Sequence, residues 1–145
     1  MSHPDTKYYE DLEVGQAHET VHTIREDDIV KFAEVSGDYN PLHMDEDYAA
    51  STQFGQRIAH GALTASYISG ILGNNLPGPG AIFTGLSMRF RRPVFIGDEV
   101  TVRAEVAEKI DRGNRITLNV SCMVGGKRVI TGEAQVVAPT REVVA

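Results

Sequence analysis

Apolar residues divide the chain into a helical first half and a strand-like second half. Between residues 26 and 73 they recur with the spacing of helices and are interrupted by loops. Between residues 81 and 137 they alternate with polar residues, as in β-strands with one buried face. No internal repeat and no long linker rich in glycine, proline or serine separates the halves. We therefore predict one domain that spans residues 1–145.

The first helix is predicted from a single apolar face. Ile29, Phe32 and Ala33 lie three and four residues apart, which places them on one side of a helix. Asp27 or Asp28 can cap its start by accepting backbone N–H groups. The pattern therefore indicates a short amphipathic helix against the core.

A loop is expected directly after this helix. Gly37 ends the helix, because glycine readily adopts the left-handed conformation found at helix ends. Residues 38–43 are not expected to form a regular helix, because Pro41 lacks an N–H donor and favours an extended residue before it. A second short helix is predicted over residues 45–51.

Residues 60–72 predict the most deeply buried helix of the chain. Small residues, among them Gly61 and Gly70, would allow a sheet to approach its backbone closely. The apolar side chains form a broad surface rather than a narrow stripe (Leu63, Ala65, Tyr67, Ile68, Ile71 and Leu72).

Strands dominate the rest of the chain. An extended stretch lies within residues 12–24, and Gly125-Gly126 has the length of a two-residue hairpin turn. Helices followed by antiparallel strands define an α+β fold, and the economical arrangement curves the sheet around helix 60–72. The four later strands are predicted over residues 82–90, 99–110, 115–124 and 128–137.

Composition narrows the classes of protein that fit. The net charge of −6 disfavours nonspecific nucleic-acid binding, which requires an excess of basic side chains. No apolar run approaches the ~20 residues that cross a bilayer, and the N-terminus does not resemble a signal peptide. We expect a cytoplasmic protein that binds neither nucleic acid nor membrane. Cys122, the only cysteine, excludes an internal disulfide and is expected to be a buried, unreactive thiol.

Asp38 and His43 are the first candidates for chemistry. They lie five residues apart across a loop stiffened by proline, so both side chains can reach one small site. A carboxylate beside an imidazole can fix the ring tautomer and share proton transfer with a water molecule. Alternatively, Asp38 only caps a neighbouring segment and His43 is an ordinary polar loop residue.

Gly61, at the start of the buried helix, is the second candidate. Its backbone N–H would be unpaired in the first helical turn, where negative charge is stabilised, and it could face a developing oxyanion. Alternatively, Gly61 only permits close packing, and the adjacent His60 caps the helix or packs against it.

Sites for metals and organic cofactors are not predicted. His18 and His22 share one face of an extended stretch but lack a third ligand, so no metal site is expected. The sequence contains no glycine-rich nucleotide fingerprint, P-loop or zinc-protease motif, and no cofactor is expected.

A small basic cluster lies at the end of the first of the later strands. Arg89, Arg91 and Arg92 lie within four residues, and Lys127 is a further cation. They are candidates by charge for binding phosphate groups, although a solvated or ion-paired surface would explain them equally well.

Three motifs together resemble the MaoC-like family, and more narrowly its single-domain (R)-specific enoyl-CoA hydratases. They are residues 37–43 (GDYNPLH), residues 58–61 (IAHG) and residues 92–98 (RPVFIGD). They occur in the family's order and approximate spacing, and the similarity extends from about residue 15 to about residue 139.

This resemblance implies a hot-dog fold, in which an antiparallel sheet wraps a long helix, and a homodimer. It implies that Asp38 and His43 are catalytic and that the Gly61 N–H faces the thioester carbonyl of an acyl-CoA substrate. It also implies that Asn40 helps to hold the loop. Ser69 matches a serine that supports the active site by hydrogen bonding, although a small residue on a helix is also explained by packing.

The resemblance further implies reversible syn addition of water to a trans-2-enoyl-CoA, giving a (3R)-3-hydroxyacyl-CoA without a cofactor. The role of each catalytic residue in proton transfer, the acyl chain length and the pathway, including supply of polyester precursors, stay open. Three alternatives are a 3-hydroxyacyl-carrier-protein dehydratase, a hot-dog thioesterase and a catalytically silent acyl-CoA-binding module.

Overall fold

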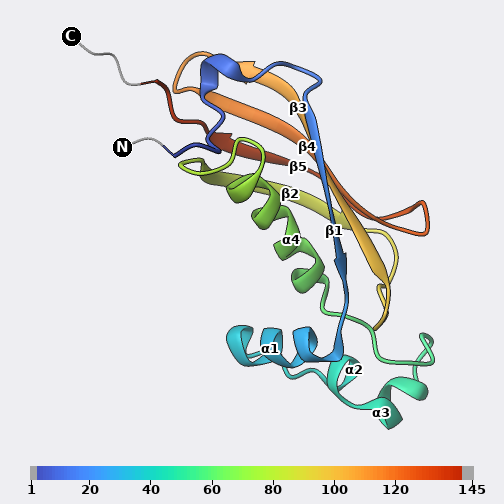
Figure 1. Cartoon of the computed structure of the whole chain (residues 1–145). Helices are drawn as coiled ribbons and strands as arrows, with labels where there is room; N and C mark the ends of the chain where they lie inside the picture. Colours follow the sequence, from blue (N-terminus) through green and yellow to red (C-terminus); the bar gives the residue numbers. More distant parts are fainter. Residues whose placement is uncertain (1–2, 142–145) are drawn as a thin grey trace.

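A five-stranded antiparallel sheet curves around one long helix (Figure 1). The computed structural model describes residues 3–141. The spatial order of the strands is β1-β3-β4-β5-β2, so β1 and β2 form the two edges. The strand bounds are β1 (Ala17–Thr23), β2 (Ile82–Phe90), β3 (Glu99–Ile110), β4 (Arg115–Val124) and β5 (Lys127–Val137).

Helix α4 (Gly61–Asn74) lies against the concave face of the sheet and forms the centre of the core. Ile68 and Ile71 of this helix are 0% and 1% exposed. Alternate residues of β3, including Val100 and Val102, are fully buried on the same side. Burying each such side chain contributes roughly 1.5–3 kcal/mol, so the helix and sheet stabilise one another. The predicted α+β hot-dog arrangement is confirmed.

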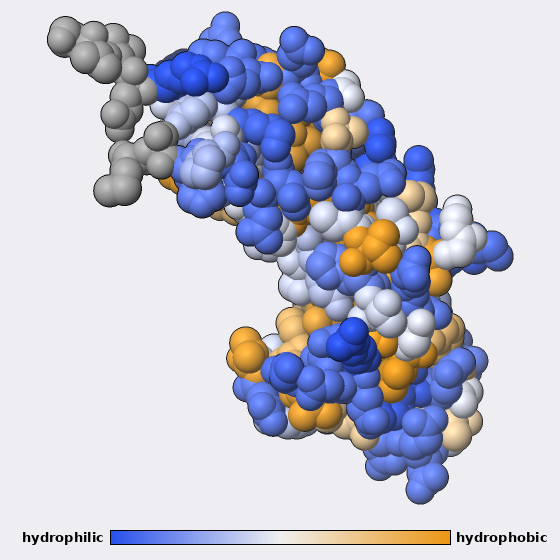
Figure 2. All heavy atoms as spheres, viewed as in Figure 1, coloured by the Kyte–Doolittle hydropathy of each residue, from blue (hydrophilic) through white to orange (hydrophobic). Residues whose placement is uncertain are grey.

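Three short helices form a separate lobe beyond the N-terminal end of α4 (Figure 1). They are α1 (Glu26–Ser36), α2 (Pro41–Met44) and α3 (Glu46–Ala50). Figure 2 shows a narrow waist between this lobe and the sheet, with hydrophobic residues exposed around it. The 3₁₀-helix η1 (Tyr9–Asp11) lies at the opposite end of the molecule.

Most predicted elements agree with the structure to within a residue or two. Gly37 ends α1 with a φ of 78°, as expected for a left-handed helix end. Gly125 and Gly126 have φ values of 57° and 78° and form the predicted two-residue turn between β4 and β5. Cys122 is fully buried, and burial raises its pKa to about 12, in agreement with an unreactive thiol.

One local prediction is confirmed in part and another was wrong. Asp28 accepts a backbone N–H at the start of α1, as predicted, from the N-cap residue Arg25 (3.1 Å). Its position is in the first turn, however, because the helix begins at Glu26. Part of the predicted loop is also helical, because Pro41 occupies the first position of α2, where no N–H donor is needed.

Among the described residues, no helix has both the length and the apolar character required to cross a membrane.

Candidate active site

Residues 38–43 are held in a fixed turn by their own side chains. An Asp38 carboxylate oxygen accepts from the Asn40 N–H (3.1 Å), and the Asn40 side-chain oxygen accepts from the Leu42 N–H (3.0 Å). Asn40 thereby caps α2, which begins at Pro41. This short helix carries His43 into the interior of the protein.

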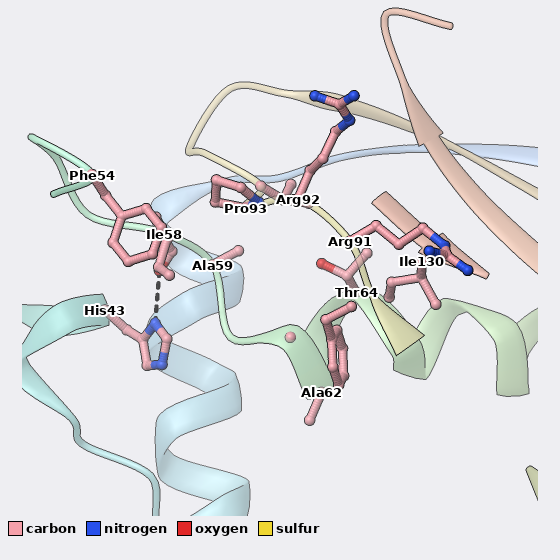
Figure 3. A pocket seen from close by; sticks show the side chains of 13 residues that line it. His43, Phe54, Ile58, Ala59, Ala62, Thr64, Arg91, Arg92, Pro93 and Ile130 are labelled. Atoms are coloured by element: carbon pink, nitrogen blue, oxygen red, sulfur yellow. Dashed lines mark hydrogen bonds between the residues drawn. The ribbon is translucent and has the colours of Figure 1, made fainter. Parts of the chain in front are cut away.

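His43 is held from both its ring and its backbone. Its Nδ1 lies 2.8 Å from the carbonyl oxygen of Ile58 (Figure 3). Since a carbonyl can only accept, Nδ1 carries the proton and Nε2 has a free lone pair in the neutral ring. The Nε of Arg57, a buried side chain, donates to the His43 carbonyl (2.7 Å), and its Nη1 pairs with Glu26 (2.6 Å). Arg57 thus fixes α2 to the start of α1.

Burial lowers the pKa of His43 below the ordinary value of 6.5. The hydrogen bond to Ile58 opposes this shift, while His60 lowers the pKa further and Asp38 raises it. The largest effect is desolvation of the charged ring. At neutral pH, His43 is therefore an uncharged imidazole that can accept a proton.

The structure brings Asp38, His43 and His60 together. Each offers one side-chain atom of a type that can bind a proton or metal, and these atoms lie within 4.8 Å of one another. The ring centroids of His43 and His60 are 4.1 Å apart, with 33° between the ring planes. Both rings already use one nitrogen in a hydrogen bond to a backbone carbonyl, His43 through Nδ1 to Ile58 and His60 through Nε2 to Asp38. A carboxylate and an imidazole this close can share a proton through one water molecule.

Gly61 is the first residue of α4 and packs against the end of β2. A Cβ atom at this position would lie 2.7 Å from Cε1 of Phe90. Close packing is thus one reason for glycine here. The predicted role of the Gly61 N–H as a donor to an oxyanion also fits this position. The N–H of a first helical residue has no acceptor within the helix, and Gly61 lines a cavity.

This cavity has a volume of about 540 Å³ and lies beside His43 and the start of α4. In Figure 3 the guanidinium of Arg92 points away from His43, on the opposite side of the cavity. Most of the wall is apolar, including Phe54, Ile58, Ala59, Phe90, Val94 and Ile130. An apolar cavity that has a neutral imidazole at one side and cations at another suits an acyl chain joined to an anionic carrier.

A family model described as "MaoC like domain" matches residues 11–134, which include all of these site residues. The chain belongs to the MaoC-like family. It is 50% identical to a 3-hydroxybutyryl-CoA dehydratase of Methylorubrum extorquens, over 93% of this chain and 86% of that protein. It is 48% identical to an (R)-specific enoyl-CoA hydratase of Rhodospirillum rubrum, over 92% and 93% of the two chains.

A solved structure supports the same relationship. An unliganded R-hydratase of Pseudomonas aeruginosa is 44% identical and superimposes with a TM-score of 0.90. The match covers 97% of this MaoC-like chain and 93% of the other.

Asn40 and Ser69, the other two site residues predicted from sequence, are not part of the cavity wall. Asn40 is exposed and supports the loop through its cap on α2. Ser69 lies on an exposed face of α4 and does not line the cavity. Its supporting role stays a prediction.

The basic cluster is divided by the end of β2 at Phe90. Arg91 and Arg92 lie beyond the strand and line the cavity, whereas Arg89 and Lys127 do not. The Nε of Arg91 donates to the Thr131 hydroxyl (2.7 Å). The two arginines at the cavity are therefore the better candidates for phosphate groups.

His22, considered above as a possible metal ligand, has a packing role. Its ring stacks on Tyr67 with a centroid distance of 4.1 Å.

Thr64 is a cavity residue that the sequence did not indicate. It is 1% exposed and lines the cavity, but its hydroxyl has no hydrogen-bond partner among residues 3–141. Its position four residues after His60, on the same helical face, is the one sequence signal that relates it to the site.

Proposed function

We propose that this MaoC-like protein is an (R)-specific enoyl-CoA hydratase. It adds water reversibly to the double bond of a trans-2-enoyl-CoA and gives a (3R)-3-hydroxyacyl-CoA. The observation that carries the proposal is the neutral, buried imidazole of His43 at the wall of an apolar cavity, with the Asp38 carboxylate beside it. The names of relatives that are 48–50% identical over nearly the whole chain support the same reaction.

In the proposed mechanism, Asp38 and His43 bind one water molecule and act as a unit. The water oxygen bonds to C3 as the electron pair of the C2–C3 double bond moves toward the thioester carbonyl. The pair accepts one proton from this water, and a proton is delivered from the pair to C2 on the same face. One water is thus added in total, and the two residues return to their starting protonation.

The Gly61 N–H is the proposed donor to the thioester carbonyl. Negative charge develops on that oxygen when the C2–C3 electron pair moves. A fixed backbone donor at a helix start stabilises such charge, and one donor of this kind contributes roughly 3–4 kcal/mol to a transition state. The dipole of α4 adds to this effect, because the helix begins at Gly61.

The acyl-CoA is proposed to enter with its phosphate groups toward Arg91 and Arg92. These cations line the cavity, and Figure 3 places Arg92 on the side opposite His43. This orientation leaves the apolar wall for the acyl chain and the pantetheine arm. The expected cytoplasmic location stays a prediction.

A homodimer is also proposed. Among residues 3–141, no strand pairs with the outer side of β2, and its exposed apolar residues include Ile82, Phe83 and Phe90, at 60%, 41% and 56% exposure. An uncovered edge with apolar side chains associates readily with another strand. A second copy of the chain offers the same edge and would extend the sheet across a twofold axis.

The first experiment is hydration of crotonyl-CoA, followed by loss of the ultraviolet absorbance of the enoyl thioester. Rapid loss with a (3R)-3-hydroxybutyryl-CoA product supports the proposal. Turnover only with a crotonyl-carrier-protein would identify the carrier-protein dehydratase instead. Release of free thiol from butyryl-CoA would identify a thioesterase, and binding of crotonyl-CoA without turnover would identify a silent module.

A further inference from the structure

His60 contacts both proposed catalytic residues from a different element. It lies at the N-cap of α4, whereas Asp38 and His43 belong to the turn after α1 and to α2. Its side chain is 1% exposed, so it is as buried as the hydrophobic core. A polar side chain buried this completely requires a reason, because desolvation of its nitrogens is unfavourable.

The first contact is a hydrogen bond to the backbone of Asp38. The Nε2 atom of His60 lies 3.0 Å from the Asp38 carbonyl oxygen. A carbonyl can only accept, so Nε2 carries the proton and donates. This bond holds the main chain at Asp38 from a residue that is 22 positions later in the sequence.

The second contact is ring packing. The centroid of the His60 ring lies 4.1 Å from that of His43 and 4.8 Å from that of Phe32. His43 is fixed in its plane by the bond to Ile58, and the ring of His60 limits movement out of that plane. Together the two contacts restrain both members of the proposed pair.

The second ring nitrogen of His60, Nδ1, indicates that the residue is not there for packing alone. The Nδ1 atom of His60 is buried and has no hydrogen-bond partner among the described residues. A side chain selected only for packing would not leave a buried nitrogen unpaired, since an apolar ring fills the same volume without that penalty. The donor at Nε2 is therefore the property that distinguishes histidine here from phenylalanine.

We propose that His60 is a positioning residue of the active site, which holds the Asp38 backbone by its Nε2–H donor and the His43 ring by packing against it. This inference rests on the proposed roles of Asp38 and His43. His60 itself does not line the cavity, so it acts through these two residues and not on the substrate. Displacing a catalytic group by about 1 Å can lower a rate about 100-fold, which gives this role a measurable effect.

The test compares three variants with crotonyl-CoA. His60→Gln keeps an amide donor at about the distance of Nε2, whereas His60→Asn places its amide too close to the backbone to reach Asp38. His60→Phe keeps a ring but has no donor. We expect His60→Gln to retain kcat within about fivefold, and the other two variants to lose about 10- to 100-fold in kcat with KM within twofold.

Separate measurements keep positioning distinct from folding. Binding of butyryl-CoA, which cannot react, should stay within twofold in all folded variants. His22→Gln is the matched control, because His22 also packs against an aromatic ring but lies outside the site, and the kcat of this variant should not change. If His60→Phe fails to fold, the comparison of Gln with Asn still decides the result.

Equal kcat in His60→Gln and His60→Asn, or wild-type kcat in His60→Phe, would overturn the positioning role. Asp38→Asn is measured in the same assay. If that variant retains full activity, the proposed catalytic pair fails; if it loses activity while every His60 variant is normal, only the inference about His60 fails.

Discussion

Asp38 lies exposed at the turn after α1, where its carboxylate accepts a hydrogen bond from the Asn40 N–H (3.1 Å). Asp38→Asn retains this acceptor but cannot take up a proton from water. We therefore expect kcat for crotonyl-CoA to fall roughly 10²- to 10⁴-fold, the usual effect of removing a general acid–base group. The thermal unfolding midpoint should stay within about 2 °C, which corresponds to less than about 1 kcal/mol. A kcat within threefold of wild type would contradict the assignment.

His43 gives the site a distinct pH dependence. Burial lowers its pKa below 6.5, so the ring loses its proton at a lower pH than a free histidine and stays neutral throughout the neutral range. Because the proposed pair requires an uncharged His43, kcat/KM should decrease as pH falls through the lowered pKa. A pH profile for crotonyl-CoA checks this. An acidic midpoint above 6.5 would show that the charged groups around His43 outweigh its burial.

The sequence indicated the proposed pair and Asn40, which caps the helix that carries His43, but not the roles of His60 and Arg57. Asp38 and His43 are close in sequence and share one stiff loop, so their spacing already suggested a common site. His60 bonds to a backbone carbonyl 22 residues away, and Arg57 bonds to another 14 residues away. Every residue type supplies a backbone carbonyl, so the sequence does not indicate which carbonyl accepts a hydrogen bond from a distant side chain.

At the scale of elements, the start of α4 meets the end of β2. A methyl group on Gly61 would lie 2.7 Å from Phe90, whose ring must then shift. We expect Gly61→Ala to lower the free energy of unfolding by about 1–3 kcal/mol, the usual effect of overpacking. In the Phe90→Ala background the same change should have less than half this effect, because the clash is gone.

Chemical denaturation of the four proteins in this cycle provides the measurement. Equal destabilisation in both backgrounds would show that the penalty does not come from Phe90. Crotonyl-CoA turnover of the double variant then tests the proposed role of the Gly61 N–H as donor to the thioester carbonyl. In this variant the clash with Phe90 is removed, but the added methyl group still occupies space next to that carbonyl.

Element boundaries were predictable where a residue type has one strong local preference. Gly37 and the Gly125-Gly126 turn are examples, since a left-handed backbone favours glycine. The beginning of α2 was mispredicted because proline disrupts a helix interior but is well suited to the first helical position. Whether Pro41 breaks or begins a helix depends on how His43 packs in the folded protein, and local sequence does not determine that packing.

At the scale of the whole molecule, the uncovered edge of β2 predicts a dimer. Light scattering with size-exclusion chromatography should give twice the chain mass of 15.8 kDa. Phe83→Asp should shift the protein toward the monomer, because a charge on the edge strand opposes association. Val21→Asp is the matched control on the opposite edge strand, β1, where 56% of the side chain is exposed. Loss of the dimer in both variants, or in neither, would contradict the assignment of this edge.

The reactivity of the Cys122 thiol can be used to measure opening of the sheet. The thiol lies in β4 at the centre of the sheet order, fully buried, with a pKa of about 12. In the native state it should not react with a thiol reagent such as dithiobis-nitrobenzoate, because reaction needs an accessible thiolate. Its slow labelling should therefore follow the opening of the central strands, and bound butyryl-CoA should slow it in proportion to the stabilisation of the folded state. Rapid labelling of the folded protein would show that the central sheet opens locally, without unfolding of the whole chain.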